Sequence, residues 1–289
     1  MSPKPRLIIL LGPTAVGKTE LSLEFAEKYS SPVISCDSRQ LYKEMSIGTA
    51  VPTEEQLARV RHYFIQDRSI HDGLYTAGRY EIEALELIHK LFEQGHDTLI
   101  MVGGSGFYID AVCKGLDDLP QADMALREEL TRRWKEEGIE SLSSQLRSID
   151  PESCLSIDMA NGQRVIRALE VCLMTGKPFS SFKTSPKKQR SFEIQKIGFT
   201  RPRDVLYERI NRRVDAMFAQ GLADEAWGLY EHRKLAALQT VGYKELFDAF
   251  DGLYDLDKAK ELIQRNSRHY AKRQMTWWGR DKDIEWREL

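Results

Sequence analysis

The chain lacks the features that would indicate a disulfide framework, a zinc site or a membrane. Its 289 residues include only 4 cysteines, with no CxxC pair and no histidines at metal-ligand spacing, so reduced thiols are expected. No apolar run approaches the length that spans a bilayer, and the run at residues 7–11 is too short for a signal peptide. We therefore expect a cytoplasmic protein that does not enter a membrane.

A strong charge of one sign is also missing. The sequence has 42 Lys and Arg against 44 Asp and Glu, which gives a formal net charge of −2. Any affinity for nucleic acid must then come from local basic patches. With 42% hydrophobic residues, the chain can bury one large core or two modest ones.

What the chain does contain is a complete phosphate-binding loop. Residues 7–11 predict a buried strand, the segment GPTAVGKT follows it, and an amphipathic helix begins directly afterwards. In this pattern backbone N–H groups and a helix N-terminus converge on phosphate oxygens. Lys18 would reach the phosphates and Thr19 would offer its hydroxyl to Mg²⁺. The predicted phosphate-binding residues are Gly12, Pro13, Thr14, Ala15, Val16, Gly17, Lys18 and Thr19.

Strand and helix patterns alternate in the first third of the chain, and only helical patterns occur between residues 123 and 175. Strands are expected at residues 6–11, 32–36, 62–65, 97–102 and 192–200. Helices are expected at residues 76–94, 123–137, 139–147, 161–175, 203–219, 222–232, 242–250 and 256–278.

This order predicts an α/β fold: a parallel sheet flanked by helices, like that of P-loop NTPases, with an all-helical insertion. We assign residues 1–113 and 199–289 to the catalytic core. Residues 114–198 form the insertion domain.

An acidic residue follows the second expected strand. Asp37 would emerge at the carboxyl end of the sheet, on the side of the phosphate loop. We interpret it as a general base; a magnesium ligand or a helix cap are the alternatives.

The strand expected at residues 97–102 ends in Gly103, Gly104 and Gly106, where the backbone must approach something closely. A nucleotide-hydrolysing P-loop enzyme would usually place an acidic residue there to organise magnesium and water. Its replacement by glycine favours group transfer to an organic acceptor over hydrolysis, although a small-molecule kinase would also have such an acceptor.

Basic residues recur on one face of two expected helices. Arg164 and Arg167 lie near the start of the first, which Asn161 would cap. In the second, Arg265, Arg268 and Lys272 share a face and alternate with aromatic residues. Such faces suit the phosphates and unpaired bases of single-stranded RNA, or they are simply solvated surface with the aromatic rings in the core.

A series of short motifs spans nearly the whole chain in a fixed order. They are GPTAxGKT at residues 12–19, DSxQxY at 37–42, IGTA at 47–50, GGSGxY at 103–108, RxxRALEV at 164–171, GYKE at 242–245 and AKRQxTW at 271–277. Together they resemble the motifs of the bacterial tRNA dimethylallyltransferases. Val51 and Gly279 depart from the family pattern, which often has Lys and Arg at these positions.

The resemblance implies transfer of a dimethylallyl group from dimethylallyl diphosphate to N6 of the adenosine immediately 3′ of the tRNA anticodon, with release of diphosphate. Lys18, Thr19 and Mg²⁺ as cofactor would then stabilise the leaving diphosphate. Arg213 matches the family's second cationic diphosphate ligand, and Asp37 matches the acid that accepts the proton of the adenine amine. These four residues are the predicted catalytic residues.

The resemblance also implies that the insertion domain contacts the anticodon stem-loop. No protein partner is evident, and a monomer is expected. The predicted tRNA-binding residues are Asp37, Ser38, Arg39, Gln40, Ser105, Arg127, Gln163, Arg164, Val165, Ile166, Arg167, Thr240, Val241, Gly242, Tyr243, Lys244, Arg268, Lys272 and Arg273.

Rival functions remain open at the level of sequence. A P-loop small-molecule kinase explains the phosphate loop and Asp37 but leaves the basic helices without a role. An adenylate isopentenyltransferase shares the chemistry without needing a large RNA surface. A pure RNA-binding protein would not need the phosphate loop.

Overall fold

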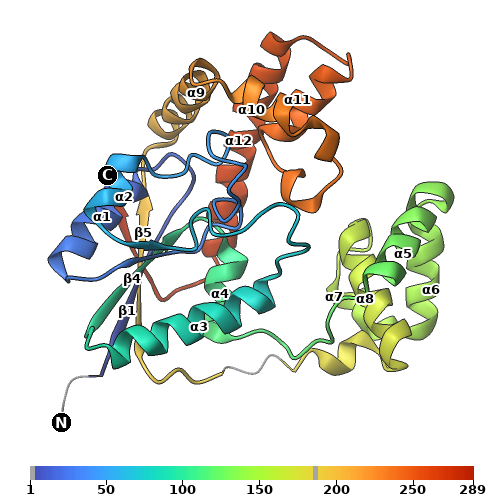
Figure 1. Ribbon diagram of the computed structural model, residues 1–289. Helices are drawn as coiled ribbons and strands as arrows, with labels where there is room; N and C mark the ends of the chain where they lie inside the picture. The colour runs from blue at the N-terminus through green and yellow to red at the C-terminus, as the bar shows by residue number, and fades with distance from the viewer. Residues whose placement is uncertain (1–3, 185–187) are drawn as a thin grey trace. The chain divides into compact units, whose positions relative to one another are not determined.

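The computed structural model of the chain describes residues 4–184 and 188–289. The chain divides into two compact units, one formed by Met1–Cys113 with Gln189–Leu289 and the other by Lys114–Lys188 (Figure 1). None of the described helices combines the length and the apolarity that a bilayer span requires.

The first unit is built on a parallel sheet, which has six strands among the described residues, in the order β3-β2-β4-β1-β5-β6. The strands are β1 (Arg6–Leu11), β2 (Val33–Ser35), β3 (His62–Tyr63), β4 (Thr98–Gly103), β5 (Glu193–Thr200) and β6 (Ile284–Glu288). Central β1 pairs with β4 and β5, and the side chains of residues 7–11 are at most 1% exposed. Burial on both faces explains its unbroken apolar run. The predicted P-loop NTPase-like fold class is confirmed.

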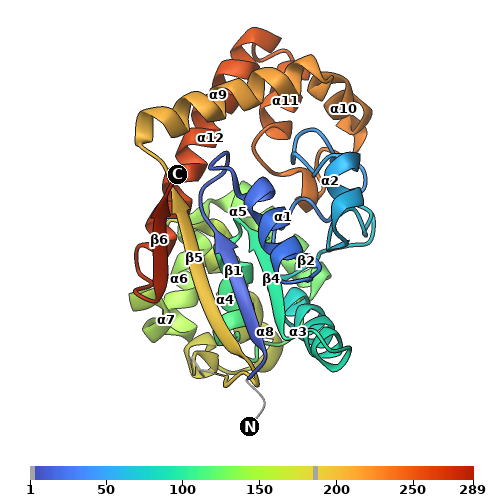
Figure 2. The ribbon, with the colours of Figure 1, turned by 90° about the vertical axis from the view of Figure 1, so that its left-hand side faces the viewer.

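Helices cover both faces of this sheet: α1 lies in front of it and α4 behind it in Figure 2. The helices of the first unit are α1 (Lys18–Lys28), α2 (Glu54–Arg59), α3 (Ala77–Glu93), α4 (Gly106–Lys114), α9 (Arg203–Ala219), α10 (Leu222–Gly228), α11 (Tyr243–Phe250) and α12 (Leu256–Trp278). On one face, β1 packs with α1 and α9 through a cluster that includes Ile8, Ala26 and Ile210. This packing brings α9 close to the end of β1, where the phosphate loop begins.

Among its described residues the second unit has helices and no strand. Its helices are α5 (Met124–Glu137), α6 (Ile139–Ile149), α7 (Pro151–Ser156) and α8 (Gly162–Thr175), followed by the 3₁₀ turn η1 (Phe179–Phe182). Its small core includes Leu130, Leu146 and Leu169. The side chain of Asn161 accepts a hydrogen bond from the backbone N–H of Arg164 and caps α8, as expected.

The return from the insertion to the core lies earlier than the sequence indicated. The expected boundary at residue 199 falls inside β5, which begins at Glu193 and pairs with β1 from its first residue. Because a strand of the central sheet belongs to the sheet's core, residues 189–198 lie with the first unit. The insertion therefore ends at Lys188 rather than at residue 198.

Candidate functional site

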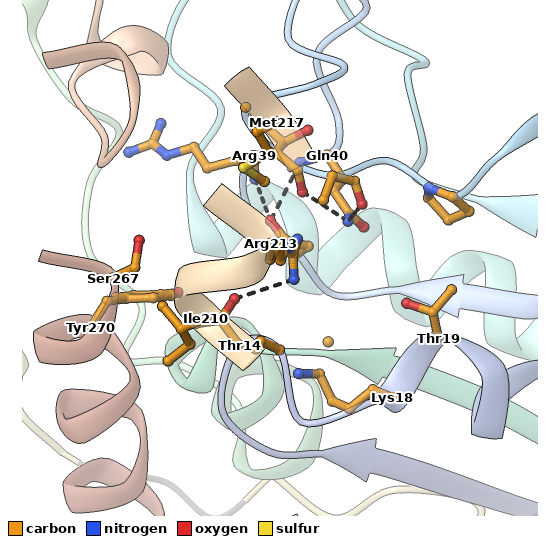
Figure 3. A pocket seen from close by; sticks show the side chains of 18 of the residues that line it. Thr14, Lys18, Thr19, Arg39, Gln40, Ile210, Arg213, Met217, Ser267 and Tyr270 are labelled. Carbon is orange, nitrogen blue, oxygen red and sulfur yellow. Dashed lines mark hydrogen bonds between the residues drawn. The ribbon is translucent and has the colours of Figure 1, made fainter. Parts of the chain in front are cut away.

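A cavity of about 760 Å³ lies in the first unit, where β1, β2 and β4 end. Its walls come from the phosphate loop, the segment after β2, residues 48–50, α9, residues 240–242 and α12 (Figure 3). Segments far apart in the sequence therefore share one space. Among the predicted residues, those that line it are Thr14, Ala15, Gly17, Lys18, Thr19, Asp37, Ser38, Arg39, Gln40, Arg213, Thr240, Val241 and Gly242.

Glycine shapes the phosphate loop at both of its ends. Gly12 has a φ of +154°, and a Cβ there would lie 2.6 Å from the carbonyl oxygen of Phe199 on β5. Gly17, with a φ of +114°, is the N-cap of α1. Between them the loop curves around the ammonium of Lys18, which donates hydrogen bonds of 2.8 Å to the carbonyls of Gly12 and Pro13. The side chain of Val16 is fully buried, so it contributes to the core rather than to the cavity.

Two arginines that sequence reasoning missed hold the outer side of this loop. Arg209 Nε donates to the carbonyl oxygen of Ala15 and Arg201 Nε to that of Val16, each at 2.8 Å. In a trans peptide the N–H points opposite to the C=O, so the N–H groups of these peptide units are directed away from the arginines. Their only sequence signal was a basic pattern at the start of an expected helix.

Two half-buried cations lie next to each other at the loop. Arg213 extends from α9, and its Nη1 donates to the hydroxyl of Thr14 at 3.4 Å, while Lys18 points into the same space (Figure 3). Burial, and then the positive charge of Arg213, lower the pKa of Lys18 to about 8, and Asp37 partly opposes this shift. Burial likewise lowers the pKa of Arg213. A pair of desolvated cations is the electrostatic signature of an anion-binding site.

The carboxylate of Asp37 is oriented by the backbone that follows it. Its Oδ1 accepts hydrogen bonds from the N–H groups of Arg39 at 2.8 Å and Gln40 at 3.3 Å, so Asp37 closes a turn after β2. Among the described residues no hydrogen bond reaches Oδ2. No helix begins directly after this turn in the described chain, so the helix-cap alternative is wrong. The turn uses Oδ1, which leaves Oδ2 available for a chemical role.

The glycines at the end of β4 allow close packing, as expected from the sequence. Each Cβ added at these positions would come within 2.6 Å of a neighbouring side chain. Gly103 faces Cys36, Gly104 faces Gln274, and Gly106 faces Trp277.

Gln274, on α12, was also missed and links two loops of the site. Its Oε1 accepts from the N–H of Thr14 at 2.9 Å, and its Nε2 donates to the carbonyl of Gly104 at 2.9 Å. The side chain is 6% exposed. A polar residue in the buried stripe of an amphipathic helix was the available signal.

The predicted RNA-contacting residues after Asp37 lie at the cavity but are bonded within the protein. The N–H of Ser38 donates to the hydroxyl of Ser105 at 3.0 Å. Arg39 Nη1 donates to the carbonyls of Ala236 at 3.2 Å and Ala237 at 3.1 Å. The two carbonyls that Arg39 contacts are neutral, so an RNA phosphate can compete with them for its guanidinium.

The C-terminal part of the predicted RNA set is only partly at the surface. Lys244, Lys272 and Arg273 are exposed, and Arg268 is half-buried. Tyr243 is fully buried, with its hydroxyl on Glu225, so its side chain does not reach an RNA and that prediction is wrong for the side chain. The reason is that Tyr243 begins α11 on the helix face that packs inward.

In the second unit the predicted run of residues 163–167 divides between two faces of α8. Gln163 and Arg164 are exposed, whereas Val165 and Ile166 are at most 1% exposed and their side chains lie in the core. The prediction that these two apolar side chains contact tRNA is therefore wrong. A helix of 3.6 residues per turn cannot present five consecutive side chains on one face, and Arg167 lies at the border.

Two of the predicted RNA-binding arginines form ion pairs with a buried acid. Glu170 is 0% exposed, and its Oε2 lies 2.5 Å from Arg127 Nη2 and 2.9 Å from Arg167 Nη1. Arg167 also donates to the carbonyl of Pro120 at 2.7 Å. Much of their charge therefore neutralises Glu170, which leaves Arg164 as the more accessible cation of this face.

Among residues 4–184 and 188–289, no group of three or more His, Cys, Asp or Glu side chains is placed to hold a metal ion. The hydroxyl of Thr19, at the first turn of α1, faces the cavity beside Lys18. A hard cation at this loop would need most of its ligands from water and from a bound phosphate compound.

Comparison with known proteins gives consistent matches over almost the whole chain. The model of the family "IPP transferase" matches residues 40–281. The tRNA dimethylallyltransferase 1 of Bacteroides fragilis is 52% identical over 97% of this chain and 92% of its own length. That of Bacteroides thetaiotaomicron is 50% identical over 98% of this chain and 91% of its own length.

Solved structures agree. The full-length tRNA isopentenylpyrophosphate transferase of Bacillus halodurans has a TM-score of 0.72 and 38% identity, and covers 99% of this chain and 90% of its own. A eukaryotic dimethylallyltransferase acting on tRNA has a TM-score of 0.77 and 25% identity, and covers 98% of this chain and 74% of its own.

Proposed function

Because the chain belongs to the IPP transferase family, we propose that it transfers a dimethylallyl group from dimethylallyl diphosphate to N6 of the adenosine immediately 3′ of the anticodon in tRNA. Diphosphate is released. The observation that carries this proposal is one cavity lined both by two neighbouring half-buried cations, Lys18 and Arg213, and by an oriented carboxylate, Asp37. The two cations suit the diphosphate that leaves the donor. The carboxylate of Asp37 suits the proton that N6 of the acceptor adenosine loses.

The cations act on the bond that breaks. As the C1–O bond of dimethylallyl diphosphate lengthens, negative charge grows on the departing diphosphate. Lys18 and Arg213 are in place before the reaction, so they stabilise this charge with little reorganisation. Diphosphate also relieves the electrostatic cost of burying two cations side by side.

The carboxylate acts on the bond that forms. The lone pair of adenine N6 is delocalised into the ring, so the amine is a weak nucleophile and benefits from orientation and proton removal. N6 attacks C1 while Oδ2 of Asp37 accepts one N6 proton and diphosphate leaves with the electrons of the C1–O bond. Two backbone N–H groups hold Oδ1, which aims Oδ2 at the cavity.

Magnesium is part of the proposal. The hydroxyl of Thr19 would hold Mg²⁺ together with oxygens of the bound diphosphate and water, in keeping with the preference of this ion for oxygen ligands. The ion would supply further positive charge to the leaving group. No carboxylate cluster is needed for such a site.

Exposed cations of both units would meet the RNA. In the first unit these are Lys244, Lys272 and Arg273, and in the second Arg164. We further propose that a monomer is sufficient for activity. A tRNA substrate would place the reaction in the cytoplasm of the cell.

The direct test uses the purified protein, Mg²⁺, radiolabelled dimethylallyl diphosphate and unmodified tRNA with adenosine 3′ of the anticodon. We expect label in the tRNA, at N6 of that adenosine after nuclease digestion. Label on added AMP alone would support an adenylate isopentenyltransferase. Consumption of ATP without transfer of label to tRNA would support a kinase, and either result would contradict the proposal.

A further inference from the structure

One carboxylate on α10 holds a wall of the cavity through three consecutive backbone amides. Oε2 of Glu225 accepts from the N–H groups of Ser46 at 2.9 Å and Ile47 at 2.8 Å, and Oε1 accepts from that of Gly48 at 3.0 Å. Successive N–H groups that converge on one point form an anion-binding nest, the arrangement by which proteins bind phosphates and other free anions. Here the anion is a side chain of the protein itself.

The same carboxylate also holds the start of α11. Oε1 of Glu225 accepts from the hydroxyl of Tyr243 at 2.6 Å, and burial together with this neighbouring charge raises the pKa of Tyr243. The tyrosine ring packs so closely on Gly48 that a Cβ there would lie 2.6 Å from it. Residues 48–50 and 240–242, which flank these contacts, line the cavity. Glu225 therefore joins two of its walls.

Direct hydrogen bonds continue from this wall to the catalytic carboxylate. The carbonyls of Thr49 and Ala50 accept from Nε2 of Gln40 at 3.2 and 2.9 Å. The backbone N–H of Gln40 in turn donates to Oδ1 of Asp37 at 3.3 Å. Residues 46–50 and Gln40 thus connect Glu225 to Asp37.

We infer that Glu225 is a positioning residue for the acceptor side of the reaction, and that its role requires an anion. The inference rests on the proposed function, in which Asp37 takes the proton of the target adenine. Glutamine at this position has one oxygen and one NH₂ group, so some of the N–H groups and the tyrosine hydroxyl would face a donor. The cations of the diphosphate site contact the phosphate loop instead, so the effect should be selective.

The experiment compares Glu225→Gln with Asp224→Asn in steady-state kinetics with tRNA and dimethylallyl diphosphate varied in turn. Asp224 is the exposed neighbour on α10, and its substitution removes the same charge. For Glu225→Gln we expect kcat/KM for tRNA to fall about tenfold or more, the loss typical of a charged hydrogen-bond partner, with KM for dimethylallyl diphosphate changed by less than about twofold. Asp224→Asn should match the wild type in both.

A second readout does not depend on catalysis. Hydrogen exchange of the amides of residues 46–48 should be about tenfold faster in Glu225→Gln than in the wild type, and unchanged in Asp224→Asn. If the wild-type protein transferred no label to tRNA, the proposed function would fail, and this measurement would still decide whether Glu225 anchors the wall.

Two results would overturn the inference. One is a Glu225→Gln enzyme with wild-type kcat/KM for tRNA; the other is a loss that affects KM for dimethylallyl diphosphate equally. If Glu225→Gln does not fold, Tyr243→Phe removes one donor and keeps the ring against Gly48. We then expect a decrease of about twofold to fivefold in kcat/KM for tRNA alone, and an unchanged value would count against the inference.

Discussion

The pKa of Lys18 leads to a prediction about how diphosphate binding depends on pH. In the free protein, burial and Arg213 lower this pKa from the ordinary 10.5 to about 8, which corresponds to about 3 kcal/mol against the charged form. A diphosphate in the loop favours the ammonium and raises the pKa again. Since Lys18 is mostly charged below pH 8 and mostly neutral above it, affinity must be lost as the pH rises through 8.

The expected magnitude follows from the fraction of charged lysine. If only the ammonium form of Lys18 binds, the Kd of dimethylallyl diphosphate increases about tenfold between pH 7 and pH 9. Isothermal titration calorimetry without Mg²⁺ measures this directly. Lys18→Arg is the matched control, because arginine stays charged over this range and any remaining slope reports the titration of the ligand itself.

The same slope for the wild type and for Lys18→Arg between pH 7 and pH 9 would refute the reasoning. It would mean that Lys18 is charged throughout, and that burial costs its ammonium little. Arg213 does not complicate the comparison, because its guanidinium stays protonated at these pH values even with a lowered pKa.

Three further predictions concern single side chains. Asp37→Asn should lower kcat by about a hundredfold or more, while the Kd for tRNA in a filter-binding assay changes by less than about threefold. Turnover close to that of the wild type would exclude Asp37 as the base. Gln274→Met leaves the N–H of Thr14 and the carbonyl of Gly104 without their partner, so the free energy of unfolding in urea should fall by about 2–4 kcal/mol. An unchanged midpoint of the urea unfolding curve would show that water replaces the amide. Arg164→Ala should weaken the binding of all tRNA sequences to a similar degree and reduce the salt dependence of log Kd by about one phosphate contact. An unaltered salt dependence would show that Arg164 does not contact the RNA.

Local patterns were sufficient for much of the fold. The strand at residues 6–11 and the helices at 203–219 and 256–278 coincide with β1, α9 and α12. The strand is marked by an unbroken apolar run, and the two helices by apolar residues that recur at helical spacing. In contrast, β6 was not predicted. It is a short edge strand with the sequence IEWRE, mostly exposed, and its pairing with β5 stabilises it rather than an apolar pattern of its own.

The errors in the candidate site arose where every residue of a sequence motif was assumed to lie at the RNA-binding surface. Residues 163–167 were carried over as a contiguous set, but helical geometry turns Val165 and Ile166 into the core of the second unit. Tyr243 was likewise assigned to RNA because its neighbours are, although its ring packs on Gly48 and its hydroxyl on Glu225.

By itself the sequence determined the phosphate loop, most of the strands and longer helices, and a family resemblance that the comparisons confirm. These depend on short-range rules: a loop between strand and helix, a period of 2 or 3.6, and motifs in a fixed order. Only the tertiary structure decided that Gln274 joins the phosphate loop to the glycine turn after β4, and that Glu225 holds residues 46–48. Such contacts join residues far apart in the chain, and no local pattern encodes which carbonyl, amide or carboxylate a side chain will reach.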